Sequence, residues 1–205
     1  MNKLFSVSDK KKVGRQPIIV VSGLPRSGTS MMMRMLAEGG LPIITDGLRR
    51  ADPDNPNGYL EFETVRQMSA GNIDWLTHAR GKGVKVISAL LEYLPSDYSY
   101  KTIFMEREVK EILASQRKML DHRNEKAKVN DAEMETQIRK HLSVMKPWLV
   151  RQPNMEVLYV NYNALIAEPG PFCEQIAEFL DIPLNQARML AVPNRRLYRN
   201  RVAPK

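Results

Sequence analysis

The sequence feature that most constrains the fold is a glycine-bearing loop, which reads Gly-Leu-Pro-Arg-Ser-Gly-Thr-Ser over residues 23–30. The run before it, residues 17–21, is short, apolar and β-branched, as is typical of a strand buried on both faces. Residues 30–36 after it are rich in Met and Leu, which favour a helix. Gly23 and Gly28 can adopt backbone angles closed to other residues, so the loop can curl around an anion at the start of that helix. The sequence therefore predicts a phosphate-binding loop.

The loop departs from the common P-loop pattern at one position. The pattern G-x-x-x-x-G-K-[ST] would put lysine at position 29, where this chain has Thr29. That lysine normally reaches the β- and γ-phosphates of a nucleoside triphosphate. A donor that carries a 5′-phosphosulfate has no γ-phosphate, and the planar fork of Arg26 could bind its oxygens instead. The departure favours a nucleotide other than ATP.

Short apolar runs alternate with helical patterns along the rest of the chain. Further strands are predicted at residues 41–45, 84–87, 102–105 and 156–160, and further helices from residue 59 and at 109–120, 131–149, 170–180 and 184–190. This alternation indicates βαβ units. The predicted fold class is α/β, a P-loop NTPase-like three-layer sandwich with a central parallel sheet flanked by helices. We expect a basic N-terminal lead over residues 1–16 and a single domain over residues 17–205.

The composition narrows the class of partner and the compartment. The net charge of +8 predicts an anionic ligand, but no aromatic strand or basic aromatic stripe supports nucleic-acid binding, so no nucleic acid is expected. Cys173 is the only cysteine, and no apolar stretch approaches the ~18 residues of a membrane span. These observations predict a cytoplasmic protein with no membrane span.

Two segments together resemble a known family. Residues 23–30, with Gly23, Pro25, Arg26, Ser27, Gly28, Thr29 and Ser30, are similar to the 5′-phosphosulfate loop of sulfotransferases, in the form found in tyrosylprotein sulfotransferases and related bacterial proteins. Arg107 follows a predicted strand, and Ser115 lies on the next helix, which resembles the family's 3′-phosphate site. The family's usual Pro or Gly is replaced by Val109, and its Lys-x-Gly-x-x-Gly signature is absent.

The resemblance implies a sulfotransferase that uses 3′-phosphoadenosine 5′-phosphosulfate (PAPS) and releases adenosine 3′,5′-bisphosphate. Sulfuryl transfer to a hydroxyl needs a base and positive charge near the departing group, but no obligatory metal. Asp46, after the predicted strand at 41–45, is the first candidate for the base, with Glu61 and Glu63 in reserve. Lys85 resembles the lysine that stabilises the transferring group, and Arg26 serves both binding and catalysis. The tail residues Arg195, Arg196, Arg199 and Arg201 could add anion contacts.

Two other readings of the loop stay open. In a P-loop kinase or NTPase, residues 41–46 would be a Walker-B strand with Asp46 on Mg²⁺, although Thr29 opposes this. A non-catalytic module that binds nucleotides or other anions is the second. The class of hydroxyl acceptor and the oligomeric state do not follow from the sequence.

Overall fold

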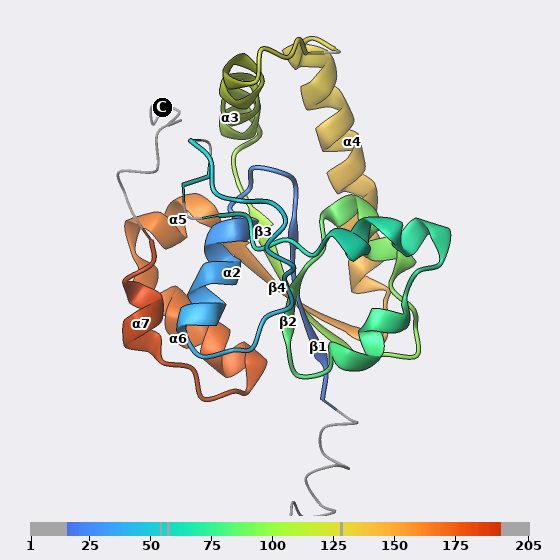
Figure 1. Cartoon of the computed structure of the whole chain (residues 1–205), viewed down its shortest axis with the longest axis vertical. Helices are drawn as coiled ribbons and strands as arrows, with labels where there is room; N and C mark the ends of the chain where they lie inside the picture. The colour runs from blue at the N-terminus through green and yellow to red at the C-terminus, as the bar shows by residue number, and fades with distance from the viewer. Residues whose placement is uncertain (1–15, 54, 57, 128, 194–205) are drawn as a thin grey trace, which may run out of the picture.

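The computed structural model describes residues 16–193, except residues 54, 57 and 128. Four strands form one parallel sheet in the order β2-β1-β3-β4 (Figure 1). Their bounds are β1 (Ile18–Gly23), β2 (Gly83–Lys85), β3 (Tyr100–Glu106) and β4 (Met155–Asn161). Val20 of β1 pairs with Val84 on one side and with Thr102 on the other. The carboxyl end of β1 therefore lies between the ends of β2 and β3.

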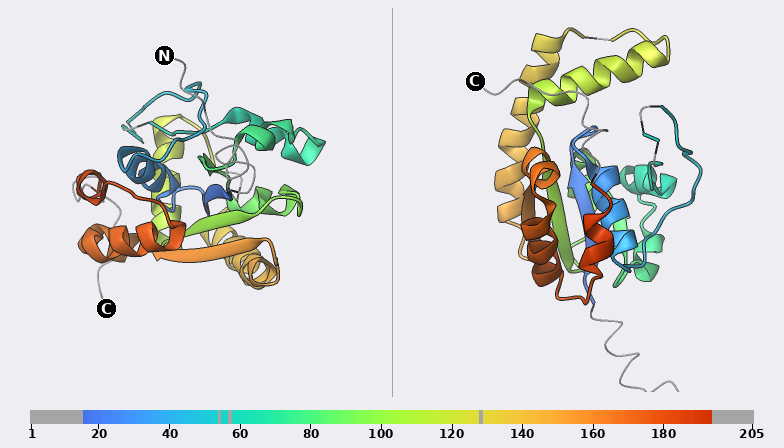
Figure 2. Two further views of the ribbon diagram at one scale, coloured as in Figure 1. Left: turned by 90° about the horizontal axis from the view of Figure 1, so that it is seen from below. Right: turned by 90° about the vertical axis from the view of Figure 1, so that its left-hand side faces the viewer.

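Helical segments cover both faces of the sheet, giving three layers (Figure 2). The α-helices are α2 (Thr29–Glu38), α3 (Val109–His122), α4 (Asp131–Val150), α5 (Tyr162–Ala167), α6 (Pro169–Leu180) and α7 (Gln186–Leu190). Three 3₁₀ segments, η1 (Glu63–Ala70), η2 (Asp74–His78) and η3 (Ser88–Tyr93), lie between α2 and β3 in the chain. The predicted α/β fold with a parallel sheet flanked by helices is confirmed.

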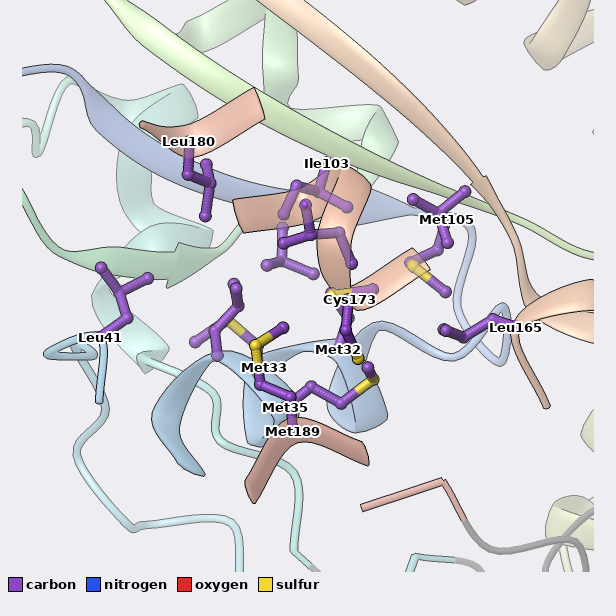
Figure 3. Packing of buried hydrophobic residues seen from close by; sticks show 14 of the residues in the cluster. Met32, Met33, Met35, Leu41, Ile103, Met105, Leu165, Cys173, Leu180 and Met189 are labelled. Atoms are coloured by element: carbon purple, nitrogen blue, oxygen red, sulfur yellow. The ribbon is translucent and has the colours of Figure 1, made fainter. Parts of the chain in front are cut away.

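Strand β1 shows why the sheet is covered on both faces. Ile19 and Val21 pack into a core with side chains of α2, α5, α6 and α7, among them several methionines (Figure 3). Ile18 and Val20 point to the other face and join a core built with η1, η2, η3 and the C-terminal half of α4. All four side chains are at most 1% exposed. A continuous apolar run is the pattern that a strand between two helical layers requires.

Two of the elements predicted between α2 and β2 are wrong. In the predicted strand at 41–45, only Ile43 bridges to Gly83 of the short strand β2, and Pro42 has no N–H to extend the pairing. The helix predicted from Tyr59 does not begin until η1 at Glu63. Leu60 has a left-handed φ of 50°, which interrupts a right-handed helix. The chain before η1 is therefore irregular, and it carries three side chains of the site, those of Arg49, Tyr59 and Glu61.

Helix α3 and the N-terminal part of α4 extend beyond the carboxyl edge of the sheet (Figure 1). Asn130 caps the start of α4, because its Oδ1 accepts the backbone N–H of Glu133 at 2.9 Å. The α3–α4 hairpin forms a wall above the strand ends.

Within the described part of the chain, no helix combines the length and apolar character needed to cross a bilayer.

Candidate functional site

The loop between β1 and α2 has the backbone geometry of an anion cradle. Gly23 has φ 139°, Arg26 has φ 71°, and Gly28, at the N-cap of α2, has φ 103°. A Cβ at Gly23 would lie 2.6 Å from both the Met105 carbonyl oxygen and Ser27 Oγ, so only glycine fits there. No side chain of the described residues caps the first N–H groups of α2. These groups are available to a ligand.

The loop also offers an unused hydroxyl. Ser27 Oγ is buried and makes no hydrogen bond within the described residues, a state that costs free energy unless a ligand or water supplies a partner. Together with the uncapped start of α2, it suits a phosphate group. The residues present therefore fit the 5′ end of a nucleotide.

A cavity of about 800 Å³ opens beside this loop. The predicted site residues on its wall are Pro25, Arg26, Gly28, Thr29, Ser30, Glu61, Glu63, Lys85, Arg107 and Ser115. Gly23 and Ser27 are buried behind the wall. The fold thus brings together segments that are up to about ninety residues apart, since Arg26 Nε donates a hydrogen bond to Ser115 Oγ at 3.0 Å.

Arg107 is held from several sides where β3 ends. Its Nε donates to Glu111 Oε2 at 3.0 Å, and its Nη1 donates to the Arg26 carbonyl oxygen at 3.0 Å. Glu111 is 1% exposed and also accepts Asn163 Nδ2 at 3.0 Å through its other oxygen. These bonds fix the orientation of the guanidinium group at the cavity.

Tyr162 joins the loop to Arg107. The Arg107 guanidinium carbon lies 4.4 Å from the centre of the Tyr162 ring, which favours a cation–π contact. The same ring lies against Gly28, where an added Cβ would collide with it. Burial raises the pKa of Tyr162, so the phenol stays neutral at physiological pH. One neutral ring therefore packs against both the glycine loop and Arg107.

Lys85 occupies the other side of the loop, at the end of β2. Its Nζ donates to Ser30 Oγ, to the Tyr59 carbonyl oxygen and to Glu61 Oε1, each at 3.0 Å. The side chain is 6% exposed. Burial lowers the pKa of Lys85, while the negative charge of Glu61 opposes that shift. Lys85 therefore links the phosphate loop to an acid that faces the cavity.

Glu61 is surrounded by cations. Arg49 Nη1 donates to both of its carboxylate oxygens at 3.1 Å, and Arg66 Nη2 lies 3.4 Å from Oε2. Arg49 also lies 3.5 Å above the Tyr59 ring. Burial alone would raise the pKa of Glu61, but the charges of Lys85 and then Arg49, with their hydrogen bonds, lower it below its ordinary value. Glu61 is therefore ionised at neutral pH.

Asp46 lies elsewhere. Its side chain is exposed and is not on the cavity wall. Its Oδ2 accepts the Glu63 backbone N–H at 2.6 Å and its Oδ1 accepts the Leu48 N–H at 3.0 Å, which lower the pKa of Asp46 in that order. Asp46 thus closes a turn and ties it to the start of η1, two residues after Glu61.

Four residues of this site were not predicted from the sequence: Arg49, Tyr59, Glu111 and Tyr162. Glu111 had a signal, because it stands four residues after Arg107 and can meet it on the same helical face. Tyr162 follows β4 directly, at the sheet edge where β1 and β3 also end. Arg49 and Tyr59 lie in irregular chain and had no such signal. The tail arginines Arg195, Arg196, Arg199 and Arg201 lie outside the described residues.

The parallel sheet, the glycine loop entering α2 and the basic residues at the strand ends define a P-loop-like α/β fold. Within that class, residues 16–200 match the sulfotransferase domain family. The chain belongs to this family, whose members typically use PAPS and act on an acceptor substrate.

Two solved structures are similar to the chain. A sulfotransferase domain from the curacin biosynthetic pathway is 16% identical, with a TM-score of 0.50, and the match covers 85% of this chain and 77% of that one. Retinol dehydratase in complex with retinol and PAP is also 16% identical, with a TM-score of 0.46 over 92% of this chain and 68% of that one. The former likeness supports the fold. No curated protein matches the sequence.

Proposed function

We propose that this protein transfers a sulfuryl group from PAPS to a hydroxyl acceptor by in-line displacement. The donor supplies the group: its bond from sulfur to the 5′-phosphate oxygen breaks as the acceptor oxygen bonds to sulfur, and adenosine 3′,5′-bisphosphate leaves. The acceptor proton must pass to a base on the protein. The observation that carries the proposal is the joining of the phosphate loop, Arg107 and Ser115 in one cavity beside the Lys85–Glu61 pair.

The donor-binding roles follow from the chemistry of the residues. Ser27, Thr29 and the first N–H groups of α2 suit a 5′-phosphate. Arg107 and Ser115 suit a second phosphate, because a fixed guanidinium supplies charge and a hydroxyl supplies a directional hydrogen bond. Arg26, hydrogen bonded to Ser115, lies between these groups and carries charge toward the departing bisphosphate.

Glu61 is the base that we favour over Asp46. It is ionised, lies on the cavity wall and is hydrogen bonded to Lys85, whereas Asp46 is not on that wall and both of its oxygens accept backbone N–H groups. Lys85 also contacts Ser30 of the loop, so it can stabilise negative charge on the transferring group next to the base. Glu63, which forms an ion pair with Arg66 at 3.2 Å, is the second candidate for the base.

Titration calorimetry tests the donor site without any acceptor. We expect adenosine 3′,5′-bisphosphate to bind about 10–100-fold more tightly than AMP, because hydrogen bonds to charged groups contribute roughly 1.5–3 kcal/mol. Arg107→Ala should remove most of that preference. Arg188→Ala, which alters an exposed arginine paired with Glu38 at 2.7 Å, is the matched control.

Equal affinities for the bisphosphate and AMP would overturn the second phosphate site. Tighter binding of ATP with Mg²⁺ would favour a kinase or NTPase instead. Transfer of ³⁵S-sulfate from labelled PAPS to a hydroxyl compound then tests the reaction itself. The cytoplasmic location stays a prediction.

A further inference from the structure

The proposed base stands on a segment without regular secondary structure. Glu61 lies just before η1, and the left-handed backbone of Leu60 precedes it. Its carbonyl oxygen is fixed, because it accepts a hydrogen bond from Thr45 Oγ1 at 2.9 Å. Its side chain is 19% exposed on the cavity wall. The direction of the carboxylate therefore depends on the cations around it.

Three cations contact that carboxylate in different ways. Lys85 Nζ donates to Oε1 at 3.0 Å. Arg66 Nη2 lies 3.4 Å from Oε2, on a side chain that is 58% exposed and also pairs with Glu63. Arg49 Nη1 donates to both oxygens at 3.1 Å. Among the contacts of the described residues, only that of Arg49 includes both oxygens, so it is the contact that fixes the orientation of the carboxylate.

Arg49 is itself supported by the ring of Tyr59. Its guanidinium carbon lies 3.5 Å from the centre of that ring, which favours a cation–π contact. Tyr59 is 4% exposed, and its hydroxyl donates to Asp52 Oδ2 at 2.7 Å. Burial, and then the hydrogen bond to Asp52, raise the pKa of Tyr59, so the ring stays neutral. Its carbonyl oxygen also accepts Lys85 Nζ at 3.0 Å. One tyrosine therefore holds two of the three cations around Glu61.

The charge of Arg49 acts on both members of the Lys85–Glu61 pair. Burial raises the pKa of Glu61, but the charges of Lys85 and then Arg49 lower it below its ordinary value. Burial lowers the pKa of Lys85, the charge of Glu61 opposes that shift, and the charges of Arg49 and then Arg26 add to it. Loss of the Arg49 charge would therefore raise the pKa of both groups.

We propose that Arg49 is a positioning residue for Glu61: supported by Tyr59, it holds the carboxylate in one orientation at the cavity. This inference rests on the proposed function, in which Glu61 takes the proton of the acceptor. Arg49 acts through this acid and not on the donor, whose proposed contacts are made by the glycine loop, Arg107 and Ser115. A planar guanidinium that stacks on a ring is not equivalent to an ammonium group, so substitution can separate charge from geometry.

The first test separates turnover from donor affinity. We expect Arg49→Gln to lower kcat about 10–100-fold for transfer of ³⁵S-sulfate from labelled PAPS to water, the simplest acceptor, because a misplaced catalytic group is costly. Affinity for adenosine 3′,5′-bisphosphate, measured by calorimetry, should stay within about twofold. Arg66→Gln removes a more exposed cation from the same acid and should lower kcat less than about threefold. Arg188→Gln, at an exposed arginine paired with Glu38, is the control.

The second test measures the titration of Glu61 without any ligand. In protein labelled with ¹³C-glutamate, the Cδ resonance of Glu61, assigned with Glu61→Gln, reports the midpoint. Arg49→Gln should move that midpoint to higher pH, because one of the charges that favour the carboxylate is lost. Arg49→Lys should return it toward the wild-type value, since the charge is restored, but should recover only part of kcat, since the planar group is not. The loss of turnover at high pH, where Lys85 gives up its proton, should also move upward in Arg49→Gln.

Two substitutions test the support that the Tyr59 ring gives. Tyr59→Leu removes the ring face, so turnover should fall about 3–10-fold while the bisphosphate affinity is kept. Tyr59→Phe keeps that face and loses the hydroxyl that binds Asp52, so its loss of turnover should be smaller. Thermal unfolding verifies that each variant is folded.

The outcomes separate the two proposals. If adenosine 3′,5′-bisphosphate does not bind, the proposed function is overturned and this inference falls with it. If it binds and the wild type turns over PAPS, but Arg49→Gln keeps both its turnover and the Glu61 midpoint, the function stands and the positioning role is overturned. A loss of bisphosphate affinity as large as the loss of kcat would make Arg49 a donor contact instead. Full recovery of kcat in Arg49→Lys would also overturn the role, since charge alone would then suffice.

Discussion

Two ion pairs flank the phosphate loop, one at the end of β3 and one at the end of β2. They differ in how far the acidic side chain is exposed and in how many cations it contacts. Glu111 is 1% exposed, and its two oxygens accept hydrogen bonds from Arg107 and Asn163. Glu61 has a side chain that is 19% exposed, lines the cavity and is shared by Lys85, Arg49 and Arg66.

This difference suggests a division of labour. An acid that is sealed by fixed partners can orient a cation but cannot reach a substrate. An acid on a cavity wall can take up a proton once a ligand competes for the cations around it. Glu111 is therefore a positioning residue for Arg107, whereas Glu61 is a candidate for chemistry.

The largest expected effect is that of Glu61→Gln. The amide keeps the shape but cannot accept the acceptor proton, so kcat should fall by about 10²–10⁴. Affinity for adenosine 3′,5′-bisphosphate should stay within a few-fold, because the proposed donor contacts are made by other residues. Steady-state kinetics and calorimetry measure the two quantities. Full activity in this variant would move the base to Glu63 or Asp46.

The second prediction concerns pH. The pKa of Glu61 is lowered from 4.5, so the base is ionised above that value and loses its charge only as the pH falls through the lower folded value. The profile of kcat/KM should therefore show no loss assignable to Glu61 above about pH 4.5, and a fall of about tenfold per pH unit below its pKa. An acid limb centred near pH 6 would contradict this assignment.

Glu111→Gln should act on affinity and not on the base. The uncharged amide weakens the hold on Arg107, so we expect the preference for adenosine 3′,5′-bisphosphate over AMP to fall about tenfold. AMP affinity itself should change little, which a merely structural role would not predict. A Glu111→Asp variant should recover part of the preference, since it keeps the charge. Equal losses for both ligands would contradict the positioning role.

The smallest expected effect is that of Asp46→Asn. An amide oxygen can still accept one of the two backbone N–H groups that Asp46 binds, so the turn before η1 should loosen only slightly. Turnover should stay within about threefold of the wild type, in contrast to Glu61→Gln. A loss of 10² or more would restore Asp46 as the base.

The sequence predicted the parts of this molecule that depend on local pattern. β1, the loop and α2 were foreseeable, because an apolar run, two glycines and a Met/Leu segment each favour one backbone state. The sequence also predicted that Arg107 follows a strand and that Ser115 lies on the next helix. Their direct link through Arg26 was not predicted, since it depends on the left-handed backbone at Arg26.

Residues 41–62 were predicted least well, and the reason is tertiary. Apolar residues 41–45 look like a strand, but β2 offers only a three-residue partner. Tyr59 and Glu61 look like the start of a helix, but the backbone at Leu60 turns the Tyr59 carbonyl and the Glu61 carboxylate toward the same lysine. Choosing Asp46 as the first candidate base followed from the expected strand, because strand ends are where such acids are sought.

The hydrogen bond from Arg107 to the Arg26 carbonyl fixes the spacing between the two proposed phosphate sites. Because Arg107 is hydrogen bonded to the backbone of the loop itself, the distance between the proposed first and second phosphate positions is set before any ligand binds. The affinity of a ligand then depends on the spacing of its two anionic groups as well as on their number. Adenosine 2′,5′-bisphosphate has the same charges at another spacing. Its 5′-phosphate would reach the glycine loop, but its second phosphate would not reach Arg107 and Ser115.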